Sequence, residues 1–362
     1  MLPGRTPRSS GTDAAATTRT HRISGLSIIL WALRIVVIAT VLIGSTLTLQ
    51  RGLLPAESWR DLLIFGIAQG SVYALIALGY TLVYGILFMI NFAHGEVFMS
   101  GAFTAYFVAV FAASEGLLDG NPIVGIAMIL LASMLTSMTV AILLERIAYR
   151  PLRGAPRLVP LITAIGASLV LQYSFRGLYG SGVRGYPQIE VLQGRWEIFG
   201  IPILRSQAVV IVAAVMLMIA LWYLVEKTST GRQMRAVSED KEVAALMGIN
   251  VDAVIVKTFA IGGLLAGAAG ILYVFIFNQV HFLMGFLPGI KAFTAAVLGG
   301  IGNIVGAMLG GLFLGVLESV GPFLFLSGFG VPSPNQLRDV IAFTMLVLVL
   351  IFRPYGILGK KP

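Results

Sequence analysis

The sequence predicts an all-α protein, a polytopic transmembrane helical bundle with about ten membrane crossings that include short or broken helices. Of its 362 residues, 57% are hydrophobic and only 11% are charged, whereas soluble domains carry about 25% charged residues. Several apolar runs reach the roughly 20 residues that a helix needs to cross a bilayer. The chain is therefore expected to form one membrane-embedded bundle rather than two soluble domains.

Composition also excludes several classes of site. The chain has no cysteine, which rules out disulfides and thiolate metal sites. Its three histidines lack metal-ligand spacing, so no metal is expected. The net charge of +9 does not indicate nucleic acid, because excess Lys and Arg in a polytopic protein usually lies in cytoplasmic loops. We expect membrane lipid, and no nucleic acid, around this chain.

The N-terminal region divides into a polar tail and an apolar run. Residues 1–25 have no apolar face, which predicts a disordered cytoplasmic tail. Residues 26–49 are interpreted as an extra N-terminal transmembrane anchor, within which Arg34 could snorkel back to the headgroups. A cleaved signal peptide is the alternative, but the run is longer than a usual h-region and a long basic tail precedes it.

The remaining spans follow from apolar runs of suitable length. With the first run they make about ten crossings, counting the short element 288–300 as one. The expected segments are 61–80, 84–113, 123–144, 158–176, 208–225, 254–277, 288–300, 303–326 and 337–352. A longer connection at 177–207, rich in turn formers and alternating residues, predicts a short hairpin.

The distribution of basic residues orients these spans. Four predicted inner segments hold fifteen Lys and Arg residues, and the predicted outer loops hold seven. Because such residues gather on the cytoplasmic side, we expect a multi-pass protein of the cell (inner, cytoplasmic) membrane with both termini in the cytoplasm. The same orientation places residues 227–252 in the cytoplasm.

Residues 227–252 form a charged segment between two long apolar runs. Ser238 resembles an N-cap, and a short amphipathic pattern follows until Gly248, which suits a C-terminal cap. Such a helix between spans could be held by a soluble partner, although a solvated loop helix is the alternative. Met247 extends its apolar face. The candidate contact residues are Glu239, Asp240, Ala244, Ala245, Leu246 and Gly248.

A polar motif, residues 91–96 (NFAHGE), interrupts an apolar stretch. Polar side chains at membrane depth usually face an interior path or a partner. Gly95 permits a break, and a broken helix exposes backbone groups that can bind a ligand. The alternative is a position at the membrane surface, in contact with water. Lys291 either snorkels outward or lines a pathway. The candidate pathway residues are Asn91, Phe92, His94, Glu96, Lys291 and Thr294.

Residues 292–315 are rich in glycine. Three glycines close together disfavour a regular helix and predict a tight link between a short element and the next span. Small residues at i, i+4 spacing let helices approach closely in lipid. The spacing does not match a dinucleotide-binding fingerprint. The candidate packing residues are Gly299, Gly300, Gly302, Gly306 and Gly310.

No catalytic or nucleotide-binding motif is present in the sequence. There is no G-x-x-x-x-G-K-[ST] loop and no Ser/His/Asp or carboxylate constellation outside the membrane. We therefore expect a transport permease rather than an enzyme, with energy supplied by another chain. Residues 145–153 (ERIAYRPLR) end a span with basic residues and are interpreted as a topology anchor.

Four blocks of this chain resemble the permease subunits of ABC importers for branched-chain amino acids, of the LIV "H" type. The blocks are GYTLVYGILFMINFAHGEVFMSGAF, ERIAYRPLR, EDKEVAALMGIN and KAFTAAVLGGIGNIVGAMLGG, and the closing RPYGILGK also fits. The resemblance runs from about residue 62 to 360 in the same order. It implies the ABC importer permease fold over 61–353, with a cytoplasmic tail at 354–362. Residues 1–60 depart from the family pattern.

The resemblance also implies partners. A sister permease subunit of the M type, or a second copy, would complete the channel. Two cytoplasmic ATPase subunits would dock on a coupling helix at 239–248, using ATP and Mg, so this chain itself needs no cofactor. An extracytoplasmic solute-binding protein would deliver leucine, isoleucine or valine. The alternatives are a permease of the related urea or amide importers, and a stand-alone secondary transporter with its own coupling site.

Overall fold

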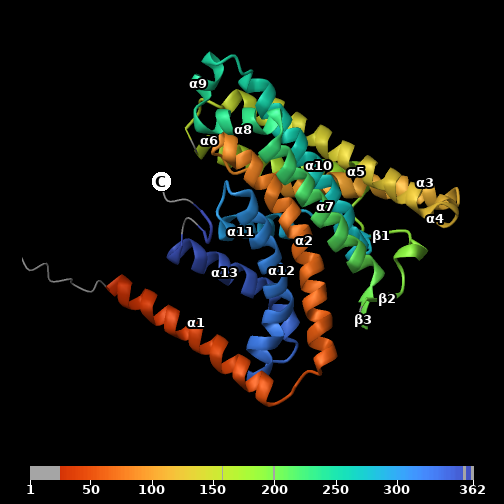
Figure 1. The fold of residues 1–362 in the computed structure, drawn as a ribbon, viewed down its shortest axis with the longest axis vertical. Helices are drawn as coiled ribbons and strands as arrows, with labels where there is room; N and C mark the ends of the chain where they lie inside the picture. The colour runs from red at the N-terminus through yellow and green to blue at the C-terminus, as the bar shows by residue number, and fades with distance from the viewer. Residues whose placement is uncertain (1–24, 157, 199, 354–355, 360–362) are drawn as a thin grey trace, which may run out of the picture.

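The computed structural model describes residues 25–156, 158–198, 200–353 and 356–359. The expected disordered tail, apart from its last residue, and part of the expected C-terminal tail lie outside these ranges. Helices account for most of the described structure, and strands are few and short (Figure 1).

Within the described residues, nine helices are long and apolar enough to cross a membrane, and one shorter apolar helix accompanies them. The prediction of an all-α bundle with about ten crossings is confirmed. The long helices are α1 (Gly25–Gln50), α2 (Ala56–Leu87), α3 (His94–Ser114), α5 (Pro122–Leu144), α6 (Leu158–Tyr179), α7 (Arg205–Lys227), α10 (Val251–Phe277), α12 (Ile304–Leu326) and α13 (Arg338–Phe352), and the shorter helix is α11 (Phe286–Gly299).

Short elements connect these helices. They are α4 (Leu117–Gly120), α8 (Ser229–Glu239), α9 (Lys241–Leu246), a π-helical turn η1 (Glu145–Tyr149), the 3₁₀ turns η2 (Arg150–Leu152), η3 (Glu190–Leu192), η4 (Ser327–Phe329) and η5 (Pro334–Leu337), and strands β1 (Arg184–Gly185), β2 (Arg195–Ile198), β3 (Ile201–Leu204) and β4 (Gln279–Val280). Strands β2 and β3 pair antiparallel, which confirms the expected hairpin, and β1 pairs antiparallel with β4.

Helices α2 and α10 form the centre of the bundle. In each, 72% of the most apolar window is buried, as expected for helices that are apolar all round. Helix α12 crosses α2 closely because glycines face each other: a Cβ on Gly311 would overlap the backbone of Ala74, and a Cβ on Gly315 would overlap that of Gly70. Backbones this close are typical of helix packing in lipid.

The break between α2 and α3 lies at 88–93, which is later than the boundary at 81–83 predicted from the sequence and just before Gly95. Helix α2 continues to Leu87 and ends where Phe88 adopts a left-handed φ of 54°. Gly95 then lies in the first turn of α3, so the prediction that it breaks a helix is wrong. A glycine is needed there for a different reason: its Cα approaches α11, where a Cβ would meet the Gly285 carbonyl at 2.5 Å and the Gly289 Cα at 3.1 Å.

The glycine-rich link has the predicted form. Helix α11 ends at Gly299, and Gly300 and Gly302 adopt φ values of 103° and 92°, which favour glycine. The Asn303 side chain then caps α12 by accepting a hydrogen bond from the Gly306 amide at 3.0 Å. A Cβ on Gly310 would overlap the Ala295 carbonyl, so the spacing does bring α11 and α12 together.

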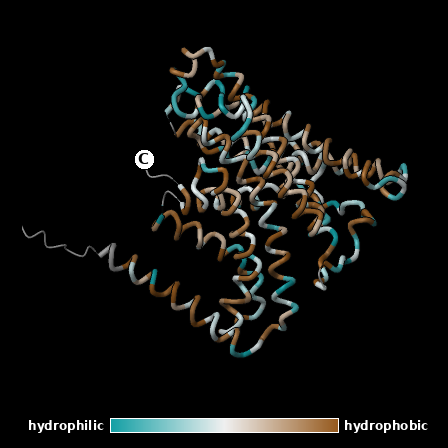
Figure 2. The backbone as a smooth tube through the Cα atoms, viewed as in Figure 1, coloured by the Kyte–Doolittle hydropathy of each residue, from teal (hydrophilic) through white to brown (hydrophobic). Residues whose placement is uncertain are grey.

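Helix α1 runs apart from the bundle and touches it mainly at its C-terminal end (Figures 1 and 2). Only 6% of its apolar window is buried. The Thr48 hydroxyl accepts a hydrogen bond of 2.8 Å from the Gly328 amide, which ties that end to the turn after α12. The Arg34 guanidinium lies 3.9 Å from the centre of the Phe352 ring, so it stacks on α13.

Candidate functional site

Glu96 is a carboxylate inside the bundle. It lies in the first turn of α3 with 1% of its surface exposed. Gln172 on α6 donates a hydrogen bond of 2.7 Å to its Oε1, and the Ser168 hydroxyl donates one of 3.3 Å to the same oxygen. Its Oε2 has no partner among the described residues and faces Gly285 at the start of α11. The carboxylate therefore joins α3 to α6 and abuts α11.

His94 lies in the same first turn as Glu96, and its side chain packs on α2. Its ring meets the Tyr80 ring edge to face, with centroids 4.9 Å apart, and its Nε2 has no partner among the described residues. A Cβ on Gly79 would overlap that ring, so α2 is recessed to hold it. Both His94 and Glu96 are buried, which contradicts the alternative that they meet water at a membrane surface.

Asn91 and Phe92 anchor the link between α2 and α3. The Tyr149 hydroxyl donates a hydrogen bond of 2.7 Å to the Asn91 side-chain oxygen. The Phe92 ring packs on the Phe293 ring of α11, with centroids 5.5 Å apart. The predicted motif 91–96 thus contacts α2, α6, η1 and α11 through separate side chains, and its polar members Asn91, His94 and Glu96 are all buried.

Lys291 and Thr294 lie elsewhere than the 91–96 motif suggested. Lys291 is buried, and its Nζ donates hydrogen bonds of 2.6 Å to Glu318 on α12 and of 2.6 Å to Asp339 on α13. It therefore does not snorkel outward. The Thr294 hydroxyl donates to the Ile290 carbonyl of its own helix at 2.9 Å. The structure does not bring these two polar groups into the cluster around Glu96.

The charged segment between α7 and α10 folds as two short helices. Ser238 lies inside α8, so the prediction that it caps the second helix is wrong. Asp240 caps α9 instead, accepting hydrogen bonds from the amides of Glu242 at 2.8 Å and Val243 at 3.0 Å. The cap shifts by two residues because the acidic side chain immediately precedes the helix and reaches both free amides.

The end of α9 is a Schellman motif at Gly248, as predicted for its C-terminal cap. The Gly248 amide donates to the Ala245 carbonyl at 3.0 Å, and the Ile249 amide donates to the Ala244 carbonyl at 3.1 Å. Gly248 itself has a φ of 83°. The chain then turns into α10 with Asn250 as its cap.

The apolar residues at α9 differ in solvent exposure: some face solvent and one is buried. Leu246 and Met247 are 86% and 77% exposed, and Val243 is also exposed. Ala244 is buried against the rest of this chain, so the expectation that its side chain is free for a partner is wrong. In Figure 1, α8 and α9 project at the top of the molecule, away from the β2–β3 hairpin, and Figure 2 shows hydrophilic residues gathered there.

An ionic network lies beneath this segment. Arg153 in the turn after η2 bonds both Glu145 on η1 and Asp252 at the start of α10. Arg150 bonds the other oxygen of Asp252 at 2.6 Å. Glu145 is fully buried, whereas Asp252 is half-exposed. Residues 145–153, interpreted from the sequence as a topology anchor, also fix the end of α5 to α10.

The basic surroundings also act on Lys241, the first residue of α9. Partial burial, together with the positive charge of Arg153 nearby, lowers the pKa of the Lys241 amine from its usual value. The start of α9 therefore lies within reach of the ionic network.

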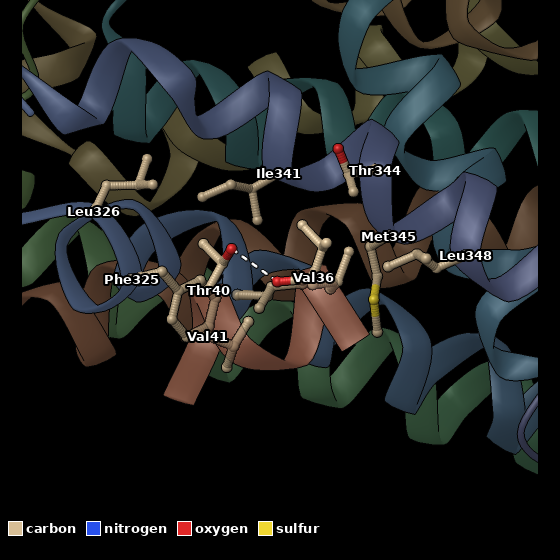
Figure 3. Close-up of a pocket in the computed structure, with 11 residues that line it drawn as sticks. Val36, Thr40, Val41, Phe325, Leu326, Ile341, Thr344, Met345 and Leu348 are labelled. Atoms are coloured by element: carbon tan, nitrogen blue, oxygen red, sulfur yellow. Dashed lines mark hydrogen bonds between the residues drawn. The ribbon is translucent and has the colours of Figure 1, made fainter. Parts of the chain in front are cut away.

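A large apolar groove separates α1 from α12 and α13 (Figure 3). It has a volume of about 330 Å³ and is lined almost entirely by aliphatic and aromatic side chains. The Thr40 hydroxyl in it donates to the Val36 carbonyl at 2.8 Å, so it is already satisfied. This groove offers no charged group to a polar solute and is suited to acyl chains.

Several buried polar partners in the bundle were not predicted from the sequence. Gln172 and Ser168 stand one turn apart in an apolar helix, and Glu318 is a lone carboxylate in another. Glu318 could have been predicted as a site residue, because ionisable residues within membrane spans usually mark a site. Its partner, and the pairing of Gln172 with Glu96, could not be predicted, because each pair joins two different helices.

Comparison with known proteins agrees with this architecture. A family model described as "Branched-chain amino acid transport system / permease component" matches residues 62–350. The chain is 44% identical over 301 residues to the high-affinity branched-chain amino acid transport system permease protein BraD of Pseudomonas aeruginosa, covering 82% of this chain and 95% of that protein. It is 40% identical over 300 residues to the corresponding permease protein LivH of Escherichia coli K12, covering 82% and 94%.

A more distant similarity points the same way. A probable branched-chain amino acid transport permease protein LivH of Methanocaldococcus jannaschii is 27% identical over 300 residues, covering 81% of this chain and 90% of that protein. The matched region begins with α2, so the family model leaves out α1.

Proposed function

Because the chain belongs to the family of permease components of branched-chain amino acid transport systems, we propose that it is the membrane-spanning permease subunit of an ATP-driven importer. Its solutes are leucine, isoleucine and valine. The similarity to high-affinity permease proteins over more than four-fifths of the chain supports this substrate class. The permease itself catalyses no reaction and moves its solute by changing conformation.

The observation that carries the proposal is the α8–α9 segment. A helix with exposed Leu246 and Met247 and with both ends capped is costly to leave in water, and it lies between two spans, α7 and α10. Apolar side chains on a rigid, projecting helix form a contact for a soluble partner. We infer that two ATPase subunits, one for each permease chain, use ATP and Mg in the cytoplasm and grip this segment.

The remaining partners follow from the same proposal. A sister permease subunit, or a second copy of this chain, completes the pathway, and an extracytoplasmic solute-binding protein delivers the amino acid. The excess of basic residues at one end of the bundle supports cytoplasmic termini and a cytoplasmic α9. The β2–β3 hairpin would then face the binding protein.

The ionic network supplies the coupling in this proposal. Motion of α9 is passed to α10 through Asn250 and Asp252, and to α5 through Arg153 and Glu145. Two spans would therefore respond together when the ATPase subunits close.

The proposal is tested with the full transporter in proteoliposomes. Leu246→Glu is expected to assemble in the membrane but to lose ATP hydrolysis stimulated by leucine-loaded binding protein, because a charge buried in the contact costs several kcal/mol. Leu246→Met, which keeps an apolar side chain at the same exposed position, is the matched control and should retain stimulation. Normal stimulation in Leu246→Glu would mean that the ATPase grips another surface.

A further inference from the structure

A second cavity, which unlike the groove beside α1 is lined by polar and charged side chains, lies at the other end of the bundle from α9. It has a volume of about 220 Å³ and lies between α2, α12 and the η5–α13 turn. In the proposed orientation it opens on the outer side, where a solute arrives. Its lining residues are Leu62, Phe65, Gln69, Glu318, Ser319, Phe323, Asn335 and Arg338.

Glu318 is the buried charge of this cavity, with 1% of its surface exposed. Its Oε1 accepts hydrogen bonds from Lys291 at 2.6 Å and from the Gln69 amide at 3.2 Å. Its Oε2 has no hydrogen-bond partner among the described residues. Oε1 of this buried carboxylate accepts two hydrogen bonds and Oε2 accepts none, although the Tyr73 hydroxyl, which accepts from Gln69, lies close to the same carboxylate.

Arg338 supplies the opposite charge at the mouth of the cavity. Its Nε lies 3.8 Å from both Glu318 Oε1 and Asp339 Oδ1, beyond hydrogen-bond distance, and its side chain is 38% exposed. Asp339 is already bonded by Lys291 at 2.6 Å. Within the described part of the chain, the guanidinium therefore keeps its paired donors available for a carboxylate.

The four charges balance: Lys291 and Arg338 are positive, and Glu318 and Asp339 are negative. A ligand with one positive and one negative group can enter without leaving net charge in the bundle. Leu62, Phe65 and Phe323 add apolar walls beside these groups. The Ser319 hydroxyl donates to the Leu62 carbonyl at 2.7 Å, which fixes α12 against α2.

We propose that this cavity binds the zwitterionic α-amino acid, with its ammonium group on Glu318 Oε2, its carboxylate on the Arg338 guanidinium and its branched side chain against the apolar walls. The site rests on the proposed function and gives it a chemical basis for substrate choice. An uncharged amide such as urea offers neither charge, and the apolar groove beside α1 offers no partner for either.

The test uses the absence of cysteine from this chain. Asn335 is exposed on the cavity rim, so Asn335→Cys places a single thiol at the mouth. In the reconstituted transporter, leucine at tenfold its Kd should slow labelling of this thiol by a membrane-impermeant reagent about tenfold. Leucinol, which lacks the carboxylate, 4-methylpentanoate, which lacks the ammonium group, and urea should each leave the rate unchanged.

The variants refine the assignment. In the Asn335→Cys background, Arg338→Gln should abolish the protection, whereas Arg60→Gln, an arginine on α2 that does not line the cavity, should keep it. Equal labelling with and without leucine, in proteoliposomes that import leucine, would overturn the site and leave the proposed function intact. Equal protection by 4-methylpentanoate would overturn charge recognition. A complex that imports no leucine would instead overturn the proposed function.

Discussion

Gln172 on α6 donates a hydrogen bond of 2.7 Å to Glu96 on α3, and the other oxygen of that carboxylate faces Gly285 at the start of α11. Helix N-termini favour negative charge. The carboxylate therefore lies between an amide donor on one side and a helix N-terminus on the other. It links three elements of the bundle through one buried side chain.

This arrangement predicts that the polar groups of the 91–96 motif act in transport. Alanine at Asn91 or Glu96 should reduce leucine uptake more than it reduces assembly, because the carboxylate and amide positions are buried where spans meet. The measurement is initial uptake divided by the amount of assembled transporter. Normal uptake by both variants would mean that the motif serves packing alone.

Arg153 should matter more for stability than Arg150, although both bond Asp252. Arg153→Gln leaves Glu145 buried without its cation, at an expected cost of about 3–5 kcal/mol. Arg150→Gln removes a half-exposed pair, worth about 1 kcal/mol or less. Thermal unfolding of the purified transporter compares the two, and equal losses would contradict the role assigned to Glu145.

Gly311 should tolerate no side chain. Gly311→Ala places a methyl group against the Ala74 backbone, and the expected cost of forcing α2 and α12 apart is about 1–3 kcal/mol. Gly166→Ala, in a helix position with open space, is the matched control and should be neutral or mildly stabilising. The measurements are the yield and the melting temperature of the two variants. Equal values for Gly311→Ala and Gly166→Ala would contradict the close packing of α2 and α12.

The orientation of the bundle is tested by single thiols. Glu239→Cys and Ser181→Cys, both at exposed positions, should label from opposite sides of the membrane, because basic residues favour the side that carries α9. Intact cells should react with an impermeant reagent at position 181 only. Labelling of both positions from outside would reject the orientation.

Local sequence patterns were enough to predict the membrane-embedded helical bundle, the glycine link after α11 and the end of α9 at Gly248. These features are local: apolar run length specifies a span, and a left-handed φ requires glycine where Gly300, Gly302 and Gly248 stand. Tertiary structure alone decided which polar groups meet. Lys291 finds partners on α12 and α13, Glu96 finds Gln172 on α6, and Ala244 turns inward. Such pairings depend on how each helix is rotated and how closely glycines let it approach, and no single segment encodes that relation.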